Sequence, residues 1–140
     1  MKCAFCDIVS GARPARVVFE DEISLAFLDK RPLFPGHVLL IPKRHYGTLV
    51  EVEPDLVGPL FENVRILAGV VEHALQAEGT FVAINNKVSQ SVPHLHVHIV
   101  PRNKGDGLKG FFWPRHPYRD EQHAEEVQKR IQAACQALRG

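Results

Sequence analysis

Histidine alternates with apolar residues over positions 94–100, and this alternation constrains the fold more than any other feature of the sequence. Successive side chains of a β-strand point to opposite faces, so a period of two predicts a strand here. One face of that strand then carries three imidazoles, those of His94, His96 and His98. A single histidine on such a face is commonly a solvated residue. Three together offer neutral nitrogen for metal binding or nucleophilic attack.

Other segments show the patterns of strands and helices. The predicted strands cover residues 17–20, 23–29, 37–41, 81–85 and 94–100, and the predicted helices cover 54–77 and 120–138. Pro59 cannot lie deep inside a helix, so the regular part of the first helix should begin near it. The apolar stripe of the second helix predicts Cys135 in the core. Because the strands mostly follow one another without helical crossovers, we predict an α+β domain: a five-stranded antiparallel sheet, helices on one face, a long helix and a C-terminal helix.

Composition excludes several classes of function. The formal net charge is +1, which gives no bulk attraction to nucleic acid or membranes. No apolar run is long enough to span a bilayer, and the first residues lack the apolar region of a signal peptide. Three cysteines, an odd number, argue against a secreted disulfide scaffold. We therefore expect a cytoplasmic protein of one domain.

Three kinds of chemistry are open to the histidine strand. All three imidazoles could bind one metal ion, but residues i, i+2 and i+4 spread over roughly 13 Å of a flat strand. One histidine could instead attack phosphorus while its neighbours, with Gln90 and Ser91, donate hydrogen bonds to the phosphate oxygens. The third reading is binding without turnover.

The N-terminal segment carries Cys3 and Cys6 in a Cys-x2-Cys pattern. Such a pair can present two thiolates to one tetrahedral zinc ion, but it is only half of a site. A redox pair or two unrelated thiols are the alternatives.

The histidine segment, Gln-Ser-Val-Pro-His-Leu-His-Val-His-Ile-Val at 90–100, resembles the signature of the histidine triad (HIT) superfamily of nucleotide hydrolases and transferases. Further segments resemble family blocks in the family order, at 19–22, 26–29, 35–38 and 41–45. The resemblance implies one HIT domain over residues 1–140, divided into an N-terminal zinc-knuckle segment (1–16), a core (17–101) and a C-terminal loop and helix (102–140).

The resemblance also implies a role for each site residue. His96 is similar to the nucleophile that forms a covalent nucleotidyl-histidine at the α-phosphate, and His98 to the donor to phosphate oxygen. The implied catalytic set is His94, His96, His98 and Gln90. The implied substrate-binding set is Asp29 for the ribose hydroxyls, Phe27 and Ile8 for the base, Asn85 and Ser91 near the phosphate, and His37 behind the triad.

Zinc-containing bacterial relatives supply the missing half of the cysteine site. By resemblance, a structural zinc ion is bound by Cys3, Cys6, His45 and His94, about one ion per chain. The resemblance further implies a homodimer that acts on a purine nucleotide, with no organic cofactor.

The sequence departs from the family in the run before the triad, which usually contains glycine. Residues 85–90 read Asn-Asn-Lys-Val-Ser-Gln, and Lys87 is a candidate phosphate contact. We expect an enzyme that cleaves a nucleoside 5′-phosphate ester, anhydride or phosphoramidate, of the dinucleoside polyphosphate or AMP-amine type. The alternative is a nucleotide-binding or scaffold protein with little turnover. An aromatic cluster at 111–113 could be a lid, a dimer contact or packing.

Overall fold

The structure is a computed structural model that describes residues 2–108 and 115–139. The chain forms two compact units, Met1–Asp106 and Gly107–Gly140. The first unit contains the helices α1 (Ala4–Ser10) and α2 (Pro54–Leu75), the 3-10 helix η1 (Leu49–Glu51), and the strands β1 (Val17–Glu20), β2 (Ser24–Leu28), β3 (Val38–Pro42), β4 (Gly79–Ala83) and β5 (Val97–Arg102). The second unit contains α3 (Glu121–Arg139).

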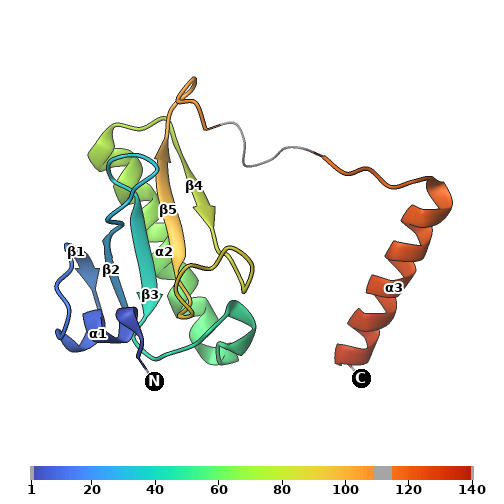
Figure 1. The fold of residues 1–140 in the computed structure, drawn as a ribbon, viewed down its shortest axis with the longest axis horizontal. Coiled ribbons are helices and arrows are strands. Elements are labelled where there is room, and N and C mark those ends of the chain that lie inside the picture. Colours follow the sequence, from blue (N-terminus) through green and yellow to red (C-terminus); the bar gives the residue numbers. More distant parts are fainter. Residues whose placement is uncertain (1, 109–114, 140) are drawn as a thin grey trace. The chain divides into compact units, whose positions relative to one another are not determined.

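The five strands form one sheet in the order β1-β2-β3-β5-β4, and each neighbouring pair is antiparallel. The chain leaves β3, passes through α2 and β4, and returns to place β5 between β3 and β4 (Figure 1). The register sets Leu39 opposite His98 and Leu40 opposite Val97. The predicted α+β fold with a five-stranded antiparallel sheet is confirmed.

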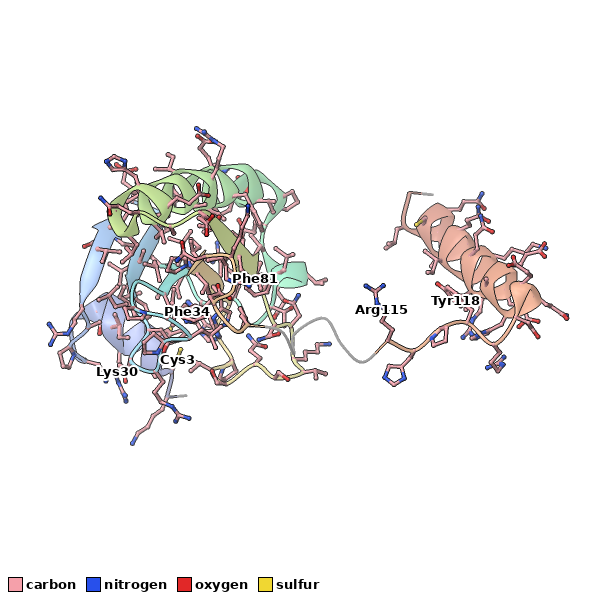
Figure 2. The ribbon with its side chains drawn as sticks, turned by 90° about the horizontal axis from the view of Figure 1, so that it is seen from above. Cys3, Lys30, Phe34, Phe81, Arg115 and Tyr118 are labelled. Atoms are coloured by element: carbon pink, nitrogen blue, oxygen red, sulfur yellow. The ribbon has the colours of Figure 1, made fainter. Side chains whose placement is uncertain are left out.

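Both faces of the central strands are buried, which explains why β2 and β3 read as nearly continuous apolar runs. One face packs against α2 through a cluster that includes Leu40, Val97 and Ile99. The other face packs against α1 through a second cluster that includes Phe5 and Leu39. In the view of Figure 2, α2 lies on one side of the strands and Cys3 on the other. Helices α1 and α2 therefore lie on opposite faces of the sheet, whereas we predicted helices on one face.

The triad strand begins later than predicted. Regular pairing in β5 starts at Val97, and the segment before it bonds elsewhere, since the amide of Leu95 donates to the carbonyl of Tyr46 at 2.7 Å. Pro93 has no amide hydrogen to offer a ladder. The pairing of β5 with β3 ends at Ile99, but β5 continues to Arg102 because Pro101 pairs with Thr80 of β4.

Helix α2 begins at Pro54, as predicted, and is regular from there and not only from near Pro59. Pro54 lies in the first turn, where no intrahelical amide bond is required, and Pro59 is accommodated inside the helix. Its buried face consists of Leu60, Asn63, Val64, Leu67 and Val71. A proline in the sixth position loses one backbone hydrogen bond, and the packed apolar face offsets that loss.

In the second unit, α3 is the regular element among the described residues. Cys135 is exposed, as are Ile131 and Leu138, so the prediction of a core position for Cys135 is wrong. Within the described part of this unit, the apolar stripe of α3 has no second helix or strand to pack against. The aromatic cluster at 111–113 lies outside the described residues. Within residues 2–108 and 115–139, no helix has the length and apolar character needed to cross a membrane.

Candidate active site and metal centre

A pocket of about 870 Å³ opens on the face of the sheet opposite α2. Six of the predicted site residues line it: Ile8, Phe27, Asp29, Ser91, His96 and His98. Its walls come from α1, the end of β2 and the segment before β5, which the sheet brings together although they are far apart in sequence. The pocket thus has an apolar end formed by α1 and Phe27 and an imidazole end formed by the triad.

The ring of His96 is held by its own backbone neighbour. Its Nδ1 lies 2.8 Å from the carbonyl oxygen of His94. A carbonyl can only accept, so Nδ1 carries the proton and Nε2 keeps its lone pair. No fully buried side-chain nitrogen or oxygen in the described chain lacks a partner. Nε2 of His96 has no hydrogen-bond partner among the described residues, so it is not fully buried and is open to the pocket that His96 lines.

A second imidazole, that of His98, is fixed through His37. The amide of Leu33 donates to Nδ1 of His37 at 3.1 Å, so the neutral His37 ring carries its proton on Nε2. That Nε2 lies 3.0 Å from Nδ1 of His98 and 3.6 Å from a carboxylate oxygen of Asp29. Nδ1 of His98 therefore accepts, and its Nε2–H remains as the donor for the pocket.

Burial keeps the imidazoles of His98 and His37 uncharged. Desolvation, reinforced by the positive charge that His96 or His37 can carry, lowers the pKa of His98 to about 4. Desolvation also lowers the pKa of His37, against the opposing pull of Asp29. At neutral pH both rings are therefore neutral hydrogen-bonding groups.

The glycine-free loop before the triad is tied to the chain that follows β3. The Gln90 amide donates to the carbonyl of Gly47 at 2.6 Å and accepts from the amide of Lys87 at 2.9 Å. Asn86 accepts from the amide of Leu49 at 2.9 Å. Lys87 and Ser89 adopt positive φ values of 70° and 61°, so non-glycine residues hold the left-handed conformation that glycine adopts most easily. Among the described residues, Gln90, Asn85 and Lys87 are not part of the pocket wall.

The four predicted zinc ligands converge at the edge of this pocket. Cys3, Cys6, His45 and His94 place one ligand atom each within 4.8 Å of one another. Sγ of Cys3 lies 3.4 Å from Nδ1 of His94, and Sγ of Cys6 lies 3.3 Å from Nδ1 of His45. The edges of a tetrahedral zinc site with these donors are about 3.4 to 3.8 Å, so the cluster has the size that zinc requires.

The proton positions of this cluster also suit a metal ion. Nε2 of His94 lies 2.9 Å from the carbonyl oxygen of Pro42, so it carries the proton and Nδ1 keeps the lone pair for a ligand bond. Without metal, burial and the neighbouring Cys3 raise the pKa of the Cys6 thiol to about 11. A metal ion entering the site must therefore displace a proton from Cys6.

A second cluster, Asp29, His37 and His98, has ligand-type side chains at similar spacing. Its proton positions do not suit a metal ion. The Leu33 amide occupies the Nδ1 lone pair of His37 and leaves the proton on Nε2, the atom that would have to bind the metal. This cluster is a hydrogen-bonded chain behind the triad.

Sequence reasoning missed several residues of the pocket wall, and four of them bear on ligand binding. Phe5, Arg13, Arg16 and Lys30 line it, and the three cations have no ion pair with a described carboxylate. The available signal for Phe5 was its spacing of three from Ile8, which sets both on one side of a helix. The cations gave no such signal, because the folding of residues 13–16 over the end of β2 is a tertiary feature.

The fold and the site together define an α+β protein with a histidine-lined pocket beside a closed Cys2His2 cluster. The HIT domain family matches residues 10–105. The chain therefore belongs to the HIT family.

Curated relatives of this chain include enzymes. The chain is 36% identical over 108 residues to adenylylsulfatase HINT3 of Arabidopsis thaliana, covering 76% of this chain and 55% of that protein. It is 38% identical over 94 residues to the asymmetrical bis(5′-nucleosyl)-tetraphosphatase of Schizosaccharomyces pombe, covering 66% and 52%. It is 34% identical over 136 residues to adenosine 5′-monophosphoramidase hnt1 of Schizosaccharomyces pombe, covering 94% and 99%. These names describe hydrolases of nucleotide derivatives, and this chain spans about half the length of the first two of these relatives.

Solved structures show the same fold. A HIT family member from Bacillus subtilis matches with a TM-score of 0.85 at 32% identity, covering 95% of this chain and 96% of that one. A zinc-bound histidine triad protein from Mycobacterium smegmatis matches with a TM-score of 0.73 at 37% identity, covering 96% and 98%.

Proposed function

We propose that this protein is a nucleotidyl hydrolase or transferase that cleaves at the α-phosphate of a nucleoside 5′-phosphate ester, anhydride or phosphoramidate. The observation that carries the proposal is the state of His96. Its Nδ1 proton is committed to the carbonyl of His94, and its Nε2 lone pair is open to the pocket. A neutral imidazole so oriented is a competent nucleophile toward phosphorus.

The reaction proceeds in two steps. Nε2 of His96 attacks the α-phosphorus, the bond to the leaving group breaks, and the leaving group departs with its electron pair. The new nucleotidyl-imidazolium keeps its Nδ1–H on the carbonyl of His94. Water then attacks the same phosphorus, and the bond from phosphorus to Nε2 of His96 breaks with its electron pair returning to the imidazole. The nucleoside monophosphate is released, and the attacking water gives a proton to solvent. His98, neutral at pH 7, donates through Nε2–H to a phosphate oxygen as charge builds.

The remaining pocket residues support a nucleotide substrate. Asp29 can accept hydrogen bonds from both ribose hydroxyls, and Ile8 and Phe27 form an apolar wall for a purine base. Arg13, Arg16 and Lys30 add positive charge to a pocket with one carboxylate, which favours an anionic ligand. The named relatives, which act on adenylyl, nucleosyl and adenosine phosphates, support the same substrate class.

We assign the Cys3, Cys6, His45 and His94 cluster to zinc. Four protein ligands leave no open position, so the ion would hold the N-terminal segment against the triad without entering the reaction. The structurally similar histidine triad protein from Mycobacterium smegmatis is zinc-bound, which supports the assignment.

Replacement of His96 tests the function. His96→Ala should abolish release of the nucleoside monophosphate from adenosine phosphoramidate, dinucleoside polyphosphate and their guanosine counterparts, a loss of at least about 1000-fold. Wild-type protein quenched during turnover should carry a nucleotide on His96, detectable by mass spectrometry. The exposed His73→Ala is the matched control and should retain full activity. Equal activity of the His96→Ala variant would contradict the proposal.

A second candidate function is nucleotide binding with little turnover. The observation that favours it is the commitment of the Gln90 amide to Gly47 and Lys87 instead of the pocket. The same substrate panel separates the two functions: this candidate predicts tight binding of AMP or GMP by calorimetry and no monophosphate release.

We further propose a cytoplasmic location, and a single domain over residues 1–140 stays a prediction.

A further inference from the structure

Phe5 lies where the metal centre, the pocket and the nucleophile meet. In sequence it stands between Cys3 and Cys6, and in the structure it is 7% exposed and forms part of the pocket wall. Its ring centroid lies 5.1 Å from that of His96, with the two ring planes at 89°. The same ring lies 5.9 Å from His94 and 5.4 Å from Phe27. Phe5 is thus in edge contact with both a predicted zinc ligand and the predicted nucleophile.

The hydrogen bond of His96 does not by itself fix the position of its reactive nitrogen. Nδ1 is anchored to the carbonyl of His94, but small tilts of the ring about that bond displace Nε2 at its far side. The ring is enclosed by its neighbours, Phe5 at 5.1 Å and His98 at 5.0 Å between centroids. Of these two neighbours, His98 is itself held by His37. The position of Nε2 of His96 therefore depends on where α1 holds the other neighbour, the Phe5 ring.

Helix α1 cannot hold that ring without help. It has seven residues, fewer than an isolated helix needs to be stable. Two kinds of contact fix it: the apolar cluster around Phe5 and Leu39, and the thiols of Cys3 and Cys6, which face His94 and His45. Because Cys3 and Cys6 flank Phe5 in the sequence, a metal ion bound to both thiols would fix the position of the Phe5 ring relative to His96.

We propose that Phe5 is a positioning residue, which holds the His96 imidazole in line for attack. Cys3 and Cys6, here called the cysteine clamp, act on the active site through the Phe5 ring. The inference rests on the proposed function, because it assumes that His96 attacks phosphorus. Misplacement of a reacting atom by about 1 Å can cost on the order of 100-fold in rate. Loss of the Phe5 ring should therefore reduce the rate of the first chemical step.

The first experiment compares Phe5→Leu with wild type in single-turnover formation of nucleotidyl-His96. Two substrates with one leaving group are used, adenosine 5′-phosphoramidate and ribose 5′-phosphoramidate, which lacks the base. The expected result is a fall of about 10- to 100-fold with both substrates, with bound zinc retained. Val9→Ala is the matched control, because Val9 packs in the same cluster on α1 but is not part of the pocket wall. It should react at the wild-type rate.

Each of the following results would overturn the proposal. A fall confined to the adenosine substrate would make Phe5 a base contact only. A fall accompanied by loss of zinc, or an equal fall in Val9→Ala, would make it a structural residue of α1. An unchanged rate in Phe5→Leu, with normal nucleotidylation of wild-type His96, contradicts this inference alone. Absence of nucleotidyl-His96 in wild type contradicts the proposed function as well.

A double variant, Phe5→Leu with Cys6→Ser, tests the link between Phe5 and the cysteine clamp. Cys6→Ser should lose zinc, measured by elemental analysis, and show the same fall in nucleotidylation as Phe5→Leu. Because both changes act through one ring, the double variant should fall no further than either single variant. Falls that multiply in the double variant would show that the clamp and Phe5 act independently, which overturns that part of the proposal.

Discussion

At the scale of single residues, backbone groups determine which nitrogen of each imidazole is available. The carbonyl of His94 takes the Nδ1 proton of His96, the carbonyl of Pro42 takes the Nε2 proton of His94, and the amide of Leu33 directs the proton of His37 to Nε2. These bonds leave a lone pair of His96 for the attack that we propose, a lone pair of His94 for the proposed zinc ion, and the Nε2–H of His37 to orient His98. Identical side chains acquire different chemistry from their backbone partners.

Burial of these rings predicts a loss of stability in mild acid. The pKa of His98 is lowered to about 4 in the folded protein, from 6.5 when unperturbed, so the unfolded chain binds its proton first as the pH falls. The free energy of unfolding should be highest above about pH 6.5 and decrease towards about pH 4. Urea unfolding at several pH values measures the slope.

His98→Gln isolates the contribution of that ring, since the zinc ligands and His37 remain in both proteins. The variant should lose less stability than wild type over the same pH interval. Parallel pH profiles for the two proteins would contradict the lowered pKa of His98.

At the scale of elements, a buried polar contact joins the β1–β2 turn to α2. Asn63, 8% exposed on the inner face of α2, donates at 2.8 Å to both Asp21 and Ser24. Burial acts to raise the pKa of Asp21, but hydrogen bonds from Asn63, Ile23 and Ser24 outweigh it and lower that pKa. The turn, the first hairpin and the long helix are thus fixed relative to one another by one amide.

Asn63→Leu tests this contact. The substitution keeps the side-chain volume but leaves Asp21 and Ser24 without the amide donor, which should cost about 1 to 3 kcal/mol of unfolding free energy. The neighbouring Glu62→Ala removes an exposed, solvent-screened ion pair with Arg65 and should lower the unfolding free energy much less. Equal losses of unfolding free energy in the two variants, measured by urea unfolding, would show that the Asn63 contacts do not stabilise the fold.

The second prediction at this scale concerns α1 and its metal. Purified protein should contain about one zinc ion per chain by elemental analysis. Removal of the ion with a chelator should lower the unfolding free energy by about 3 kcal/mol or more, the value for free zinc near 100 times its dissociation constant. Protein that contains no zinc, or whose thermal midpoint is unaffected by chelation, would contradict the assignment.

At the scale of the whole molecule, the first unit exposes apolar side chains on α2 and on the edge strand β4. Ile66, Val70 and Leu75 are 42%, 51% and 44% exposed, and Val82 is 42% exposed. Strand β4 ends the sheet and has β5 as its one partner in the described chain. Such a surface is typical of an interface between subunits, and it supports the predicted homodimer.

Sedimentation equilibrium at micromolar concentration tests that homodimer. Wild type should sediment as a dimer, and Val70→Glu should shift it towards monomer because a charge is placed in the apolar surface. Val50→Glu is the matched control, since Val50 is 89% exposed on η1 and lies outside the surface. A stable wild-type monomer would contradict the prediction.

The sequence by itself determined those features that depend on local periodicity and motif spacing. Alternation at 94–100 and the apolar runs at 17–20 and 37–41 predicted strands that overlap β5, β1 and β3, because side-chain direction is fixed by position along a strand. The Cys-x2-Cys pair and the triad, in the family order of blocks, specified the candidate metal ligands and nucleophile.

Only the tertiary structure decided how these pieces meet. The start of β5 at Val97 depends on the carbonyl of Tyr46, which takes the amide of Leu95. The placement of Phe5 against His96 depends on α1 packing on the far face of the sheet, and the ring protons depend on partners up to 61 residues away, as in the His37–His98 pair. Contacts between distant segments leave no periodic trace in the sequence, so they become visible only when the chain is folded.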